Sequence, residues 1–131
     1  MKKPIWLLFL ILFVSGCASS APDNTPTPVL HKIKYVYASD VNFCMGEITI
    51  QKSATETEKL TLFPNGSAAE ITLTMKAGDK AWMQADYMTS TKNIPCDVIC
   101  RIFLDGNLWK EAKSTGTKGT RAVCEGIVGE K

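Results

Sequence analysis

Cysteine is the residue type in this chain best suited to chemistry, and the sequence contains five of them together with a single histidine. Cys17 ends a short apolar segment near the start of the chain. The other four are spread over the rest of it, at Cys44, Cys96, Cys100 and Cys124. A thiol can be acylated, oxidised in pairs to a disulfide, or bound to a soft metal. The surroundings of each cysteine favour one of these chemistries over the others.

The first sixteen residues have the composition of a secretory signal peptide. Lys2 and Lys3 form a basic head, residues 4–14 are apolar, and small residues precede Cys17. The apolar segment is too short for a transmembrane helix, which needs about 20 residues. Its ending, Val14-Ser15-Gly16-Cys17, resembles the lipobox of bacterial lipoproteins. The resemblance implies that Cys17 carries palmitate-type acyl chains and is the mature N-terminus. The alternative is a plain secreted protein whose signal ends near a cysteine.

The residues after Cys17 predict a location and a tether. Lipoprotein sorting in general implies retention at the inner membrane when Asp follows the acylated cysteine, and here Ala18 follows it. We therefore expect an outer-membrane protein that faces the periplasm. Residues 17–29 are rich in Pro, Ser and Thr, which predicts an extended tether of roughly 3 Å per residue. Residues 30–131 are enough for one domain with a single core.

The charge of the chain argues against nucleic acid as a partner. Its formal charge of +2 is lost with Lys2 and Lys3 when residues 1–16 are removed, which leaves a neutral mature chain. Nucleic-acid binding needs a basic stripe, and none is present. We expect contact with the membrane through the lipid anchor and with an envelope protein; the sequence specifies no ligand.

Apolar and polar residues alternate through the domain with the period of a β-strand, as in Ile33, Tyr35 and Tyr37. Such runs predict seven or eight strands, at 31–38, 47–52, 58–63, 69–75, 80–88, 97–104, 107–113 and 120–127. The run at 80–88 is also compatible with two helical turns. Asp105-Gly106 between two strands predicts a type I′ hairpin. These features indicate an all-β fold: a small antiparallel, immunoglobulin-like β-sandwich with two disulfides, or a small barrel.

Four cysteines in an exported domain predict two disulfides. If Cys96 and Cys100 lie on one strand, their Cα atoms are about 13 Å apart, beyond the roughly 7 Å that a disulfide spans. Cys44 then pairs with Cys96 while Cys100 pairs with Cys124, or Cys44 pairs with Cys100 while Cys96 pairs with Cys124. A metal site is the competing interpretation, but structural zinc sites favour closely spaced cysteine pairs and an oxidising compartment disfavours free thiolates.

The segment from Cys96 to Cys100 has the spacing C-x-x-x-C and superficially resembles the copper-chaperone motif of Sco-type proteins. That resemblance would imply a copper or redox protein. Sco-type proteins add a distant histidine ligand and a thioredoxin fold, whereas the only histidine here is His31, far upstream, and no βαβ pattern surrounds the cysteines. We therefore expect structural disulfides and no metal or other cofactor.

A longer stretch resembles the MmpS family of small accessory proteins. It contains Cys100-Arg101-Ile102-Phe103-Leu104-Asp105-Gly106 and closes with Ala122-Val123-Cys124. The resemblance implies a β-sandwich outside the membrane that assists an RND-type exporter. It also implies a disulfide between Cys100 and Cys124, which leaves Cys44 to pair with Cys96. The chain departs from that family in its apparent acyl anchor and in having this second cysteine pair.

No residues combine into a base, a nucleophile and an orienting group, so we expect no enzyme activity. His31 is predicted to be solvated, and Asp105 is explained by its hairpin turn. Trp109 is predicted to lie opposite Ile102 and to face the core. The leading hypothesis is a lipid-anchored binding or accessory module, for example of an RND-type transport complex. The alternative is a lipoprotein that binds a small ligand or inhibits a hydrolase.

Overall fold

The computed structural model describes residues 25–39, 46–62, 69–88, 95–117 and 119–130. Within these ranges the chain forms eight β-strands and no helix, so no helix there is long and apolar enough to cross a membrane. The strands are β1 (Leu30–Ala38), β2 (Gly46–Gln51), β3 (Thr57–Leu62), β4 (Ala69–Lys76), β5 (Lys80–Tyr87), β6 (Cys96–Leu104), β7 (Asn107–Gly116) and β8 (Arg121–Ile127). All eight predicted strands are present, and the ambiguous run at 80–88 is a strand.

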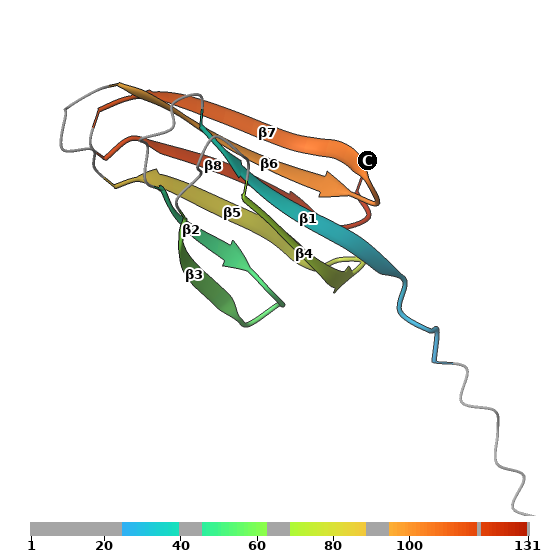
Figure 1. Ribbon diagram of the computed structural model, residues 1–131. Helices are drawn as coiled ribbons and strands as arrows, with labels where there is room; N and C mark the ends of the chain where they lie inside the picture. The colour runs from blue at the N-terminus through green and yellow to red at the C-terminus, as the bar shows by residue number, and fades with distance from the viewer. Residues whose placement is uncertain (1–24, 40–45, 63–68, 89–94, 118, 131) are drawn as a thin grey trace, which may run out of the picture.

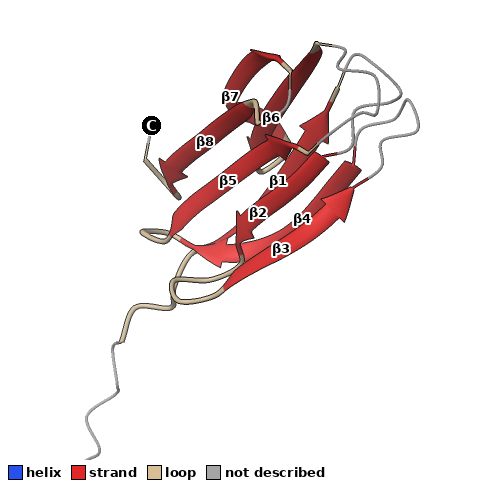
Figure 2. Ribbon diagram, turned by 90° about the vertical axis from the view of Figure 1, so that its left-hand side faces the viewer, coloured by secondary structure: helices blue, strands red, loops and turns tan. Residues whose placement is uncertain are grey.

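The strands form two antiparallel sheets of four. One sheet, called here the β1 sheet, has the order β4-β1-β6-β7; the other, the β2 sheet, has the order β3-β2-β5-β8. Figures 1 and 2 show them as two facing layers, a β-sandwich-like arrangement. The described strands thus form two separate sheets, with no pairing between them in these ranges, and not the closed sheet of the alternative small barrel.

The core lies between the layers and is filled by alternate residues of each strand. In β5 every second side chain is buried, from Ala81 to Tyr87, and the same alternation runs along β6 from Cys96 to Ile102. Burial of one face and exposure of the other is what the period-two pattern predicts for a sheet packed on one side. Large side chains from β1 and β2 fill the middle: Tyr35, Tyr37, Ile48 and Ile50.

Tyr35 connects the two sheets through its hydroxyl group. From β1 the hydroxyl reaches the facing sheet, where it donates to the carbonyl oxygen of Gln51 (2.9 Å) and accepts from the backbone N–H of Trp82 (3.3 Å). A buried hydroxyl without a partner would carry a desolvation penalty, and these two bonds remove it. Burial raises the pKa of Tyr35 to about 12.

The β6–β7 hairpin confirms one prediction and corrects another. Asp105 and Gly106 both have positive φ angles, 50° and 87°, as a type I′ turn requires. Beyond the turn the register shifts: Phe103 faces Leu108, but Ile102 faces Lys110 rather than Trp109. The predicted pairing of Trp109 with Ile102 was wrong because it assumed that the register at the turn continues along both strands. A β-bulge instead inserts one extra residue into β7.

Candidate functional site

The predicted Cys100–Cys124 disulfide is formed. It joins β6, inside the β1 sheet, to β8, at the edge of the β2 sheet, with 6.2 Å between the two Cα atoms. Both residues are buried, with Cys100 fully excluded from solvent. The bond therefore fastens the two layers together at this side of the core. Cys17, the predicted site of acylation, lies outside the described residues.

Cys96 lies on the same face of β6 as Cys100, is buried, and is also disulfide-bonded. Cys44, its predicted partner, lies outside the described residues, so the Cys44–Cys96 pair stays a prediction. Because the sulfur atoms of both Cys96 and Cys100 are in disulfides, this state of the C-x-x-x-C segment holds no free thiolate for copper. The described ranges also contain no cluster of three or more His, Cys, Asp or Glu side chains suited to a metal ion.

Trp109 lies at the bulge in β7 and still packs partly buried against the core, as predicted. Its ring reaches Gly126 of β8, in the other sheet. A Cβ atom added at Gly126 would lie 2.5 Å from Cη2 of the indole. The bulge and this glycine together allow the indole to close the side of the core next to the Cys100–Cys124 disulfide.

His31 and Asp105 form a clamp that was not predictable from the sequence. Nδ1 of His31 lies 2.7 Å from Oδ2 of Asp105, while the backbone N–H of Lys32 donates to Oδ1 (2.8 Å). The backbone N–H of Asp105 donates in return to the carbonyl oxygen of Lys32 (2.9 Å). His31, predicted to be solvated, is partly exposed, with 20% of its side chain accessible, and it is bonded to Asp105. The clamp joins the start of β1 to the β6–β7 turn.

The bond from His31 and the one from the Lys32 backbone hold the pKa of Asp105 below its ordinary value. Both favour the ionised carboxylate, because each places a hydrogen-bond donor against it. Asp105 therefore supports the fold as an anion. His31 and Asp105 do have the spacing of a base and its orienting group, but the contacts found here hold β1 to the hairpin.

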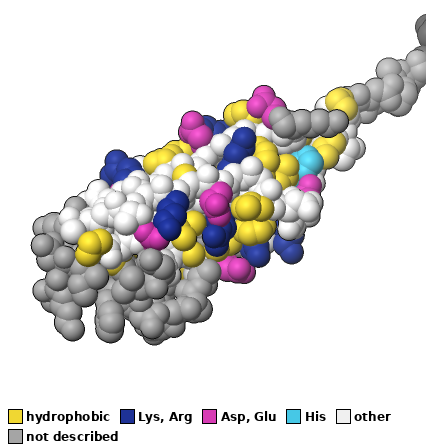
Figure 3. Space-filling model, turned by 90° about the horizontal axis from the view of Figure 1, so that it is seen from above, with side chains coloured by type: hydrophobic (Ala, Val, Ile, Leu, Met, Phe, Trp, Pro, Cys, Tyr) yellow, Lys and Arg dark blue, Asp and Glu magenta, His cyan; other side chains and the backbone are white. Residues whose placement is uncertain are grey.

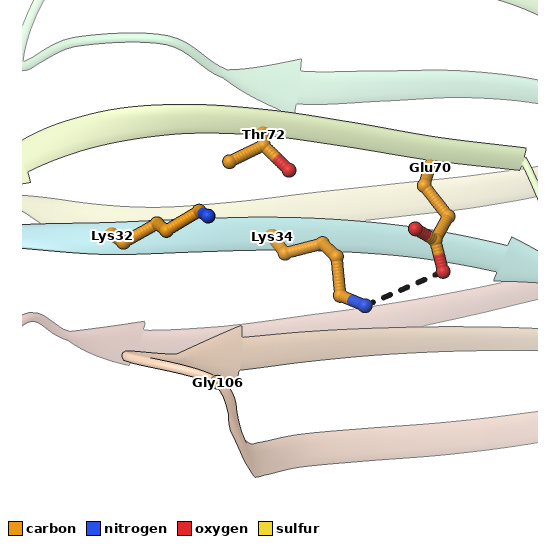
Figure 4. Close-up of a pocket in the computed structure, with 5 residues that line it drawn as sticks. All are labelled: Lys32, Lys34, Glu70, Thr72 and Gly106. Atoms are coloured by element: carbon orange, nitrogen blue, oxygen red, sulfur yellow. Dashed lines mark hydrogen bonds and ion pairs between the residues drawn. The ribbon is translucent and has the colours of Figure 1, made fainter.

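A groove opens on the outer face of the β1 sheet beside this clamp. It has a volume of about 330 Å³ and is lined by Lys32, Lys34, Glu70, Thr72 and Gly106. Figure 4 shows the two lysines on β1, Thr72 and Glu70 on the neighbouring β4, and Gly106 at the hairpin turn. The register of the two strands creates this set, because Lys34 faces Thr72 directly and Lys32 faces Thr74.

The lysines in the groove differ in their contacts. Nζ of Lys34 lies 3.4 Å from a carboxylate oxygen of Glu70 and 4.7 Å from the centre of the Phe103 ring. Lys32, by contrast, forms no ion pair with any other described residue. An ammonium group on an aromatic face gains cation–π attraction, so Phe103 holds Lys34 in position. An anionic group in the groove would meet two ammonium groups and the hydroxyl of Thr72, together with the carboxylate of Glu70, which pairs with Lys34.

Farther along the same outer face, charges pair with charges on adjacent strands. Arg101 of β6 pairs with Glu111 of β7, and Lys113 of β7 pairs with Asp97 of β6. Basic and acidic groups are accordingly interspersed over the surface in Figure 3. Such pairs neutralise the charges of that part of the face. The groove at the start of β1 differs because its Lys32 has no ion-pair partner among the described residues.

The groove could not be found from sequence periodicity, because its lysines and threonine read as ordinary solvent-facing residues of two separate strands. The one available signal was that Lys32 and Lys34 share a face of β1. Compared with known proteins, the sequence matches no protein-family model and no curated protein.

Proposed function

We propose that the protein is a lipid-anchored β-sandwich of the cell envelope that acts as a non-enzymatic binding or accessory module, in the manner of a component of an RND-type transport complex. In this proposal acyl chains on Cys17 hold it at the outer membrane, residues 17–29 are a tether facing the periplasm, and residues 30–131 form an immunoglobulin-like domain. Two acyl chains are sufficient for stable membrane anchoring.

The observation that carries the proposal is the disulfide between Cys100 and Cys124. It joins the β6–β7 hairpin to β8 at the positions that the resemblance to MmpS implies. The same hairpin contains the Asp105-Gly106 turn of that motif. The two-layered all-β fold also agrees with a β-sandwich accessory protein outside the membrane.

The contacts of His31 and Asp105 give both residues a structural role, which supports a non-enzymatic module. Both side chains contribute to the clamp between β1 and the hairpin, and their geometry is explained by that structural role. Replacing His31 with Ala at matched protein abundance should therefore leave the cellular phenotype intact. A lost phenotype with unchanged folding would favour a catalytic or metal-binding role.

Crosslinking in intact envelopes tests the partner directly. We expect the tagged wild-type protein to capture a subunit of an RND-type pump. A Cys17→Ser variant at matched abundance should capture it several-fold less, because an unacylated and uncleaved precursor is not delivered to the outer membrane. Specific capture of a hydrolase alone would instead support the inhibitor alternative. Equal recovery by both proteins, or no specific partner, would contradict the anchored accessory module.

A further inference from the structure

The outer face of the β1 sheet carries a basic and apolar patch at the end where the chain enters from its tether. The patch consists of Leu30, Lys32 and Lys34 on β1 and Thr72, Thr74 and Lys76 on β4. We call it the tether-end patch. Leu30, Lys32 and Lys34 share one face because alternate residues of a strand do. Leu30 faces Lys76 across the strand pair, so an apolar side chain lies among the lysines.

Two large apolar side chains are exposed side by side at this end. Leu30 is 59% exposed, and the preceding Val29 is 61% exposed, although its carbonyl oxygen is fixed by the backbone N–H of Ala77 (2.9 Å). Large apolar side chains next to lysines are the combination found where proteins lie on a lipid surface, with apolar groups in the interface and cations at the head groups. Nothing in the packing of the core requires either residue to be apolar.

The charges of the patch favour an anion. Lys32 and Lys76 form no ion pair with any other described residue, and Lys34 shares its charge with Glu70 across 3.4 Å. Asp105 bonds to His31 and to the Lys32 backbone, and Asp79 accepts from the backbone N–H of Lys76 (3.1 Å), so neither carboxylate forms an ion pair with an ammonium group of the patch. A phosphate in the groove would meet the Lys32 and Lys34 ammonium groups and the Thr72 hydroxyl.

The position of the patch selects a membrane phosphate over a dissolved one. Leu30 directly follows the tether of residues 17–29, and Figure 1 shows the chain leaving the strands at this end of β1. The geometry points to a docking surface: the tether-end patch binds the phosphate head groups of an anionic phospholipid membrane, with Val29 and Leu30 in the interface. This inference rests on the proposed lipid anchor, which brings this end of the domain to the bilayer.

Co-sedimentation with vesicles tests the docking without the anchor. The protein is the mature chain from residue 17 with Cys17→Ser, and the vesicles contain phosphatidylcholine with or without phosphatidylglycerol. We expect binding only when phosphatidylglycerol is present. We expect the double variant Lys32→Gln, Lys34→Gln to bind at least about tenfold more weakly than the wild type. Each lysine near an anionic membrane surface contributes substantially to the binding free energy. Leu30→Gln should also weaken binding.

The matched control is Lys59→Gln with Lys113→Gln, which removes the same charge at acid-paired lysines outside the patch. It should bind as the wild type does, with circular dichroism showing that every variant is folded.

An equal loss of vesicle binding in both double variants, equal binding of the wild type to neutral vesicles, or no vesicle binding would overturn the docking surface. Amide shifts at Lys32 and Lys34 with inorganic phosphate, without vesicle binding, would assign the groove to soluble phosphates and overturn it too. Palmitate labelling at Cys17 is a separate measurement, so failure of the anchor and failure of the patch are distinguishable.

Discussion

Trp109 of β7 and Gly126 of β8 are in contact across the two sheets, and the glycine leaves no room for a side chain beneath the indole. A Cβ atom at residue 126 would lie 2.5 Å from Cη2 and 2.6 Å from Cζ2 of Trp109. The two residues lie beside the Cys100–Cys124 disulfide, which fastens the same two sheets. Close packing and a covalent bond thus hold this side of the sandwich together.

Replacing Gly126 with Ala should destabilise the fold by about 1–3 kcal/mol, the usual range for overpacking a core. Urea unfolding measures the loss. Combining Gly126→Ala with Trp109→Phe, which removes the ring atoms that clash, should recover part of it. If the two substitutions were simply additive, the contact between these residues would not be the cause.

Removing the disulfide by Cys100→Ala with Cys124→Ala should lower the free energy of unfolding by about 2–5 kcal/mol. Reduction of the wild type under the same conditions provides a comparison. Peptide mapping of the oxidised mature protein should recover Cys100 linked to Cys124, and we predict Cys44 linked to Cys96. A peptide that links Cys96 to Cys124 would contradict this connectivity.

The clamp at Asp105 predicts a stability difference that depends on pH. The pKa of this carboxyl is lowered in the folded protein from its ordinary value of 3.8 by its bonds to His31 and the Lys32 backbone. Its contribution is therefore present above pH 3.8 and lost as the pH falls through the lower folded value. Asp105→Asn keeps a residue suited to the turn, so it isolates the charge.

Thermal unfolding as a function of pH measures this contribution. The wild type should be more stable than Asp105→Asn at about pH 5 to 6, where the carboxyl group is ionised in both the folded and the unfolded protein. The difference in stability should disappear in strong acid. A difference that stays constant as the pH falls below 3.8 would show that the carboxylate charge contributes nothing.

Two tyrosines should resist ionisation in alkaline solution. Burial raises the pKa of Tyr35 and that of Tyr37 to about 12, with the nearby Tyr87 adding to the effect at Tyr37. Because the folded values lie above the ordinary value of 10.0, their stabilising contribution is complete below that pH and is lost as the pH rises toward 12. Ultraviolet titration of phenolate should show two ionisations near pH 12, and Tyr35→Phe should remove one of them. Ionisation of Tyr35 and Tyr37 near the ordinary value would contradict the burial of these rings.

Local sequence patterns were sufficient to predict the strands. Alternation of apolar and polar residues is clearest in β2 and β4, because a strand with one buried face buries every second side chain. The Asp105-Gly106 turn was predictable for a similar reason: few residue pairs accept two positive φ angles, and this pair does. Even the ambiguous run ending at Tyr87 obeys the strand pattern, with Ala81 and Met83 buried between half-exposed neighbours.

Features that depend on distant contacts were not predictable. The bulge places Trp109 against Gly126 in the other sheet, and no residue near the turn signals it. His31 and Asp105 are 74 positions apart and meet only because β1 pairs with β6. The groove likewise depends on β4 pairing with β1, a partner that the alternation in either strand does not specify.

Metabolic labelling with palmitate measures whether Cys17 anchors this domain to a membrane. The wild-type protein should incorporate the label and migrate as the processed form. The Cys17→Ser variant should incorporate none and accumulate as uncleaved precursor, because the resemblance to a lipobox makes this cysteine the site of both acylation and cleavage. A wild type that takes up no palmitate, together with a Cys17→Ser variant that is processed normally, would contradict the lipoprotein account.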